Sequence, residues 1–356
     1  MTTNDEFQAN YHLATVRKVA VLVCSIIGVV FTVGFISLSV CDDITLAEAY
    51  NYIWNHLIGT QYEPRSQDWW NDRFIWNRSI PRALTAIVAG ISLAAAGVMM
   101  QSLMNNPLAD PYSTGISSGA CFGAVSAIVT GAMLNTAFGN NTTVVFAFIG
   151  AMIPALIIIL ISSRIIVTPA TLILLGTAIS YFFNSMITYL MVTTDADTLQ
   201  SAYIWQIGTL NTVTWDQMPI IVSISLAGSF IVLLLSKKLN LLSLGDNSAK
   251  SLGLDVETFR IICLTLMAVM TAGIVSFTGI LGFVGLVTPH IVRFLVGSDN
   301  KFVTPIAMAF SAFLLLISDY LAQTVFDVQV GAVLALIGSP IFFILIVMQR
   351  KGKGVY

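Results

Sequence analysis

Two ionisable residues stand in apolar surroundings, where such side chains often carry protons or ions. Asp319 lies inside an apolar run near its end, and His290 follows Pro289 and precedes Arg293 in another run. Ionisable groups at membrane depth are costly and therefore often functional, so Asp319 and His290 are candidates for a relay in an ion-driven transporter. For a lone histidine of this kind, a structural hydrogen bond is the more frequent role.

Sequence patterns for catalysis, nucleotide binding and metal binding are absent. No H-E-x-x-H, G-x-S-x-G or paired-carboxylate pattern occurs. The one lysine that precedes a serine or threonine is Lys250, and a phosphate-binding loop would need glycines where Leu244 and Ala249 stand. The four cysteines have no paired spacing. We therefore expect a chain that is not an enzyme and binds no metal or cofactor, and that relies on another subunit if ATP drives it.

The composition is that of a membrane protein. The 356 residues are 56% hydrophobic and 10% charged, and the mean hydropathy is +0.86, far above the range of soluble domains. A helix needs about 20 mostly apolar residues to cross a bilayer. Ten runs qualify, at residues 18–41, 82–103, 115–134, 143–161, 170–192, 217–235, 256–277, 279–296, 302–322 and 330–348. We expect an all-α membrane protein with a single transmembrane domain over residues 1–356, a bundle of about ten transmembrane helices.

The distribution of positive charge predicts how this bundle is oriented. Twelve of the sixteen Lys and Arg residues lie in segments on the N-terminal side of the membrane, and the other four lie in or beside the long loop of residues 42–80. Positive residues collect in cytoplasmic loops, so both termini are predicted to be cytoplasmic. Residues 42–80 are then extracytoplasmic, and their stretch "LAEAYNYIWNHLI" predicts an amphipathic helix on the outer surface. The net charge of −2 gives no indication of nucleic-acid binding.

Residues 236–255 form a predicted cytoplasmic loop that contains a short helix of its own. Asp246 is a suitable N-cap, and Gly253 suits the left-handed position just after the last turn. So short a helix is unstable alone in water and must pack against something. It is either an ordinary surface helix on its own bundle or a docking element for a cytoplasmic partner.

Small residues recur on single faces of several spans, which favours close packing of helices in lipid. In the second span Gly90, Ala94, Gly97 and Gln101 share one face. Comparable stripes are Gly176, Ser180 and Asn184 in the fifth span, and Gly331, Ala335 and Gly338 in the tenth. The stripes predict helix contacts, and their polar members Gln101, Ser180 and Asn184 are the better candidates for lining a transport path.

Four further segments of the sequence are distinctive: "IPRALTAIVAGISLAAAGVMMQSLMNNPLADPYSTGISSGA" (residues 80–120), "LGDNSAKSLGL" (244–254), "GFVGLVTPHIVR" (282–293) and "VGAVLALIGSPIFF" (330–343). They resemble segments of the FecCD permeases, the membrane subunits of ABC importers for iron-siderophore complexes, haem and cobalamin. Their order and spacing match the family over nearly the whole chain. The resemblance implies ten spans per subunit and work as a dimer with two ATP-binding subunits, which hold the ATP and Mg, and an extracytoplasmic substrate-binding protein.

The resemblance also assigns roles to individual residues. In the family the short loop helix is a coupling helix that sits in a cleft of the ATPase subunit. This implies that role here for Leu244, Gly245, Asp246, Ala249, Leu252 and Gly253. Outer arginines of the family pair with acidic residues of the binding protein, which implies docking by Arg82 of the "IPR" element and by Arg78, one position away from the family's second arginine. The fifth and tenth spans are implied to line the path.

The predicted function is that of a cell-membrane permease subunit of an ABC importer that takes up a bulky metal chelate. A ferric siderophore is the first choice of cargo, cobalamin the second and haem the third. Two alternatives stay open. One is a transporter driven by an ion gradient through Asp319 and His290, which would work without an ATPase. The other is an interaction scaffold that moves nothing.

Overall fold

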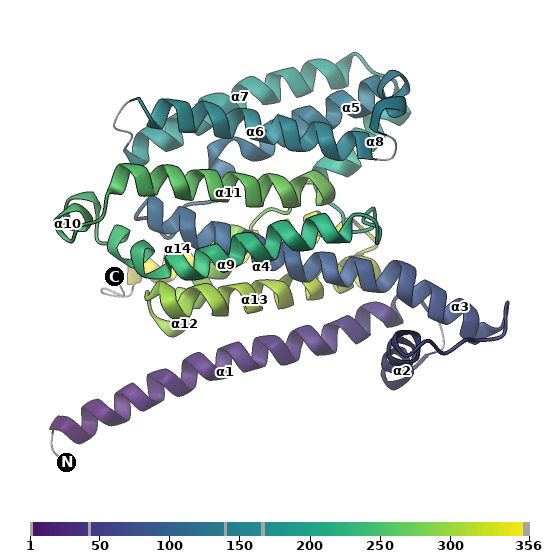
Figure 1. Ribbon diagram of the computed structural model, residues 1–356, viewed down its shortest axis with the longest axis horizontal. Coiled ribbons are helices and arrows are strands. Elements are labelled where there is room, and N and C mark those ends of the chain that lie inside the picture. The colour runs from purple at the N-terminus through teal and green to yellow at the C-terminus, as the bar shows by residue number, and fades with distance from the viewer. Residues whose placement is uncertain (1–2, 42–43, 139–140, 165–167, 352–356) are drawn as a thin grey trace.

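A computed structural model describes residues 3–41, 44–138, 141–164 and 168–351, and over these residues the protein is a helical bundle without strands (Figure 1). Ten helices correspond to the ten predicted spans. They are α1 (Thr3–Leu38), α4 (Ile80–Leu103), α5 (Ile116–Phe138), α6 (Thr142–Ser162), α7 (Pro169–Val192), α9 (Met218–Leu242), α11 (Val256–Thr278), α12 (Val284–Val296), α13 (Asn300–Leu321) and α14 (Val330–Lys351). Among the described residues, seven helices are long and apolar enough to cross a membrane, and α5, α12 and α14 contain shorter apolar stretches.

Short helices connect the long ones. They are α2 (Leu46–Leu57), α3 (Gln67–Phe74), the π-helix η1 (Ile75–Ser79), the 3₁₀ helix η2 (Pro111–Thr114), α8 (Ala196–Ile207), α10 (Asp246–Ser251) and the π-helix η4 (Ala322–Phe326). The predicted amphipathic helix is α2, which begins with a capping box between Thr45 and Glu48. Helix α8 was not predicted from the sequence, although Asp195 caps its start and Gly208, with φ of 85°, ends it.

The two ends of the bundle carry different elements. The N-terminal end of α1, the C-terminal end of α14 and the short helix α10 lie at one end, and α2 and α3 lie at the opposite end (Figure 1). This arrangement is the one that the predicted topology requires. We call the end with α10 the inner end and the end with α2 the outer end; that the inner end faces the cytoplasm stays a prediction from the charge distribution.

Two of the predicted spans begin well away from their predicted starts. The first helix begins at Thr3 instead of residue 18, because the polar residues before the apolar run continue the same helix. The eighth was expected from residue 279, but α12 begins only at Val284. Gly279 has φ of 69° and Phe283 has φ of 67°, so the chain turns at both residues and cannot be helical between them.

Glycines on the predicted stripes lie where helix backbones touch. A Cβ atom on Gly97 of α4 would stand 1.8 Å from the carbonyl oxygen of Gly285 in α12, and one on Gly331 of α14 would stand 1.6 Å from the carbonyl oxygen of Ile207. Gly90 and Gly176 come close to the backbones of Ala312 and Ser113, and Gly338 packs against the side chain of Phe283. These positions hold glycine because any side chain would push the elements apart.

Replacing Gly97 by alanine is expected to destabilise the bundle by about 1–3 kcal/mol, because α4 and α12 must separate to admit the methyl group. Thermal unfolding in mild detergent measures the effect. Gly131→Ala in α5 is the matched control, since no atom lies within 4 Å of a Cβ at that position. Equal melting temperatures for the two variants would contradict the prediction.

Candidate functional site

The predicted loop helix is present as α10, between α9 and α11 at the inner end (Figure 1). Gly253, with φ of 88°, follows its last turn as predicted. The prediction that Asp246 is the N-cap is wrong. Gly245 occupies that position, and Asp246 is the first helical residue, without a side-chain cap bond. The carboxylate of Asp246 instead accepts two hydrogen bonds from Nη2 of Arg260, at 2.9 and 2.8 Å, because this nearly buried guanidinium requires an anion beside it.

Several contacts hold α10 firmly on the bundle. Ala249 is fully buried against the core, and Lys250 pairs with Glu257 of α11. Asp255 caps the start of α11, and hydrogen bonds from the hydroxyl and the amide of Thr258 hold the pKa of its carboxyl below the ordinary value. The loop is therefore a rigid projection whose position follows that of α11.

Two leucines project from this rigid loop into the surroundings. Leu244, just before α10, and Leu252, just after it, are each 59% exposed. The other side chains of α10 that face outward are small or polar. Large apolar side chains on a well-ordered polar loop are typical of an interaction surface. We name Leu244, Leu252 and α10 together the coupling knob.

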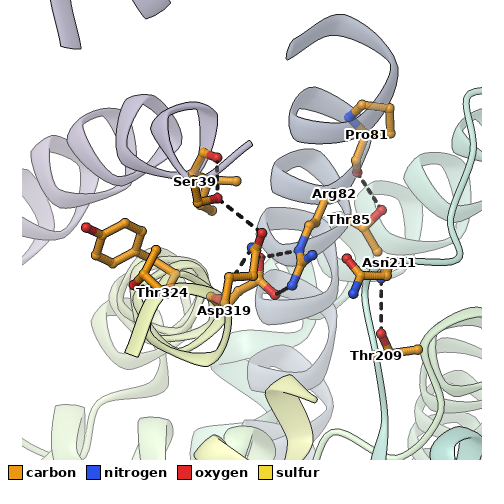
Figure 2. A network of polar contacts seen from close by, with 11 residues as sticks. Ser39, Pro81, Arg82, Thr85, Thr209, Asn211, Asp319 and Thr324 are labelled. Atoms are coloured by element: carbon orange, nitrogen blue, oxygen red, sulfur yellow. Dashed lines mark hydrogen bonds and ion pairs between the residues drawn. The ribbon is translucent and has the colours of Figure 1, made fainter. Parts of the chain in front are cut away.

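A buried ion pair joins helices at the outer end (Figure 2). Arg82 in α4 donates two hydrogen bonds of 2.7 Å to Asp319 in α13, one from Nε to Oδ2 and one from Nη2 to Oδ1. Asp319 is fully buried and Arg82 is 8% exposed. Nε2 of Gln323 also donates to Asp319 at 3.0 Å, and Ser39 at the end of α1 donates to Oε1 of Gln323 at 3.1 Å. The network ties α1, α4 and α13 together.

This network changes the role expected of Arg82. The guanidinium of Arg82 is buried and binds both carboxylate oxygens of Asp319. Arg82 is therefore not the exposed docking cation that was predicted. Arg78 is exposed, with its guanidinium 5.9 Å from the ring centre of Phe74, and stays a docking candidate. Asp319 is clamped on both oxygens and is poorly suited to carry an ion. The structural hydrogen bond favoured for His290 is not seen at Nδ1, which is buried without a partner among the described residues.

Polar side chains gather at the inner end around Arg293 of α12. Its guanidinium donates to Oε1 of Gln101 at 3.2 Å, to Oδ1 of Asn300 at 2.8 Å and to the carbonyl of Ser298 at 3.1 Å. Gln101 is 3% exposed and donates to the carbonyl of Leu286 at 3.1 Å, so it points into protein as predicted. Gln101 and Arg293 border a cavity of about 550 Å³.

The predicted path residues do not share one surface. Gly90, Gly97 and Gln101 lie inside the bundle, whereas Asn184 of α7 is exposed and Ser180 is half-buried. Thr177, Tyr181 and Thr188 are also exposed and lie on the same face of α7 as Asn184. We name Thr177, Tyr181, Asn184 and Thr188 the α7 polar stripe. The hydroxyls of Thr177 and Thr188 donate to carbonyls of α7 itself, but hydrocarbon offers no partner for the exposed amide of Asn184, which therefore suits a face turned toward water or another protein.

Sequence reasoning missed the partners of several residues in these sites. Arg260 is 14 residues from Asp246, and Asn300 is 198 residues from Ser102, whose hydroxyl it contacts. No local pattern indicates such pairs. A search for N-caps would have found Asp299, which accepts a hydrogen bond from the amide of Lys301 at the start of α13.

Comparison with known proteins identifies relatives over most of the chain. The model of the FecCD transport family matches residues 29–348. The hemin transport system permease protein HmuU of Yersinia pestis is 36% identical, over 78% of this chain and 85% of that protein. The Fe(3+)-citrate import system permease protein YfmD of Bacillus subtilis is 30% identical, over 97% of this chain and 99% of that protein.

A solved structure shares the fold. It is an ABC transporter in an inward-facing conformation, described as of the metal-chelate type. It superposes with a TM-score of 0.78 at 28% identity, over 92% of this chain and 99% of that chain. Because the family match spans most of the sequence and the bundle has the same architecture, the chain belongs to the FecCD transport family, as a multi-pass permease subunit of an ABC transporter in the cell membrane.

Proposed function

We propose that this permease imports a metal chelate, with a ferric siderophore as the first choice of cargo and cobalamin and haem as the next. A binding protein delivers the chelate at the outer end, and two ATPase subunits act at the inner end on two copies of this chain. The observation that carries the proposal is the coupling knob, with Leu244 and Leu252 each 59% exposed on a rigid loop. Such a surface suits an apolar cleft in a cytoplasmic partner.

The contacts of the knob suit it to transmit force. Asp246 is joined to Arg260 and Lys250 to Glu257, so α10 and the first turn of α11 move as one body. Ala249 packs into the same core as Val256 and Phe259 of α11. A displacement of the knob by its partner therefore displaces α11 directly, without being absorbed in a flexible loop. This is the mechanical link that alternating access driven by a separate ATPase requires.

A second copy of the chain would cover the α7 polar stripe. Asn184 exposes an amide on a helix long and apolar enough to span the membrane, and hydrocarbon gives that amide no hydrogen-bond partner. If two copies face each other across α7, the stripes enclose a polar path between them. The choice of an iron complex as cargo is supported by the names of two relatives, which refer to hemin and to ferric citrate.

Cysteine labelling tests the path. In a Cys24→Ala background, which removes the exposed cysteine, Asn184→Cys is expected to react with a charged, membrane-impermeant maleimide in intact transporter. Phe182→Cys is the matched control, because Phe182 is exposed on another face of α7 that we expect to meet lipid. Equal reaction of the two positions would contradict a water-filled path along the stripe.

Transport in liposomes tests the function as a whole. The chain, co-purified with its ATPase and supplied with its loaded binding protein, is expected to take up a radiolabelled ferric chelate when ATP is present on the ATPase side. A protonophore should leave the initial rate unchanged. Parallel trials with haem and cobalamin rank the three cargoes. Uptake that continues without the ATPase and stops when the ion gradient collapses would favour an ion-driven transporter instead.

A further inference from the structure

A hydrogen-bonded cluster at the inner end connects the helix that leads into the coupling knob with the helix at the centre of the bundle. Its members come from α4, α9, α12 and the start of α13. They are Gln101, Ser102, Asn240, Arg293, Asp299 and Asn300, which we name the inner polar cluster. The mechanical link described above runs through α11, whereas this cluster offers a second connection, through α9.

Asn240 is the contribution of α9, and it stands four positions before Leu244 of the knob. Its Nδ2 donates to Oδ1 of Asp299 at 2.7 Å, and its Oδ1 accepts from the backbone amide of Asn300 at 2.8 Å. Both polar atoms of the side chain are thus bound to the first residues of α13. A movement of the end of α9 therefore pulls on that turn through two short hydrogen bonds.

Asn300 passes the connection from α9 to α4. It is fully buried, and its Nδ2 donates to the hydroxyl of Ser102 at 3.0 Å. Its Oδ1 accepts from Arg293 at 2.8 Å, and Arg293 in turn donates to Gln101 at 3.2 Å. Ser102 and Gln101 form the last turn of α4, directly before the turn of residues 104–111. Two routes from Asn300, one direct and one through Arg293, end on the same turn of α4.

A cavity lies beside the inner polar cluster, between the inner ends of α4 and α9. The cavity of about 550 Å³ is lined by Gln101 and Arg293 and also by Asn240, Ser243 and Leu244. The ends of α4 and α9 therefore border open space here, and hydrogen bonds through Asn300 join them. Hydrogen bonds to a charged group such as Arg293 are also stronger than neutral ones, so the bridge is stiff.

We propose that Asn240 and Asn300 are positioning residues that transmit the movement of the coupling knob through α9 to the inner end of α4, and so help to open and close the inner mouth. This inference rests on the proposed function, because it assumes that a partner moves the knob. It predicts that breaking the cluster uncouples ATP hydrolysis from transport without preventing assembly.

The test uses the complete transporter in liposomes and measures transport per ATP hydrolysed. Asn240→Asp places a carboxylate against Asp299, and transport per ATP is expected to fall by roughly 3- to 30-fold, the usual range for residues that couple sites. Adding Asp299→Asn removes one of the two facing negative charges, so transport per ATP should recover in part; full recovery is not expected, because Oδ1 of Asp299 accepts from both Asn240 and the amide of Lys301, and one amide atom cannot be donor and acceptor at once. Asn51→Ala on α2, an exposed asparagine at the outer end, is the control.

The outcomes separate this proposal from the function on which it rests. Two results would overturn the proposed transmission through Asn240 and Asn300. One is unchanged transport per ATP in Asn240→Asp. The other is failure of the paired variant to recover while its melting temperature and its bound ATPase match those of the parent. The proposed function would stand in that case, provided that the parent transports. If the parent chain retains no ATPase, the proposed function itself fails. A purely structural role would lower the melting temperature and the amount of complex, but not transport per ATP in the complex that remains.

Discussion

Replacing Leu244 and Leu252 by aspartate is expected to release the ATPase subunits and abolish ATP-driven transport, while the bundle stays folded. Both side chains are mostly exposed, so the substitutions remove little internal packing. Apolar anchors at the centre of an interface commonly contribute about 2 kcal/mol or more each. Such a loss weakens binding about 30-fold per residue. Two charges placed in an apolar cleft increase the effect. The amount of ATPase that co-purifies with the tagged permease measures it.

The control for this prediction is the same substitution at the other end of the bundle. Leu57→Asp on α2 changes a leucine of similar exposure, 63%, and should leave the bound ATPase unchanged. A milder series, Leu244→Ala and Leu252→Ala, shows whether each residue contributes alone. If the double aspartate variant binds its ATPase as the parent does, the coupling knob is an ordinary surface helix and the scaffold or ion-driven alternatives regain support.

Removing one member of the buried ion pair is expected to destabilise the protein strongly. Asp319→Ala leaves Arg82 buried without its anion, and such a change typically costs about 3–5 kcal/mol. Arg82→Ala should also destabilise the protein, because it leaves the fully buried carboxyl of Asp319 without the guanidinium that binds both of its oxygens. Melting temperatures in detergent and the yield of folded protein measure the loss. Arg78→Ala is the matched control. Its guanidinium is exposed and forms no ion pair with any residue that the structure describes, so the free energy of unfolding should change by no more than about 0.5 kcal/mol.

A paired apolar replacement separates stability from docking. Arg82→Met with Asp319→Leu removes both charges, so most of the lost stability should return, as for other buried pairs replaced by packed apolar residues. If this paired variant still accepts cargo from the binding protein, Arg82 serves the fold. If it is stable and has lost that interaction, while Arg78→Ala has not, then Arg82 does take part in docking after a conformational change.

The contacts of Asp319 also bear on whether transport is driven by ATP or by an ion gradient. Asp319 was the one acidic residue inside an apolar run, and it is held on both oxygens by Arg82 and further by Gln323. An ion carrier must release its ion and change charge, which this clamp opposes. The knob, by contrast, presents two apolar side chains where a partner can reach them. Both observations favour a permease that is moved by another subunit.

Properties that depend on short stretches of chain could be predicted from the sequence. The apolar runs predicted ten helices because a helix must be about 20 residues long to cross a bilayer. The structure has a helix at each of these places, although α12 is only 13 residues long. The helix within residues 46–58 was also recognised from its periodicity, and the short helix that ends before Gly253 from its end signal, since such signals act within a few residues. The glycines of the small-residue stripes correctly predicted close contacts, though not which elements meet, whereas Asn184 of the fifth-span stripe is exposed.

Which polar groups find each other was decided by the tertiary structure. Arg82 meets Asp319 across 237 residues, and Gln101 meets Arg293 across 192. From the sequence alone Arg82 resembled an exposed docking residue and Asp246 a helix cap, because each has the right neighbours for that role. Arg82 is buried and pairs with Asp319, and the buried guanidinium of Arg260 pairs with the carboxylate of Asp246. A charged group withdrawn from water must be paired, and only the packing of distant helices determines which partner lies within reach.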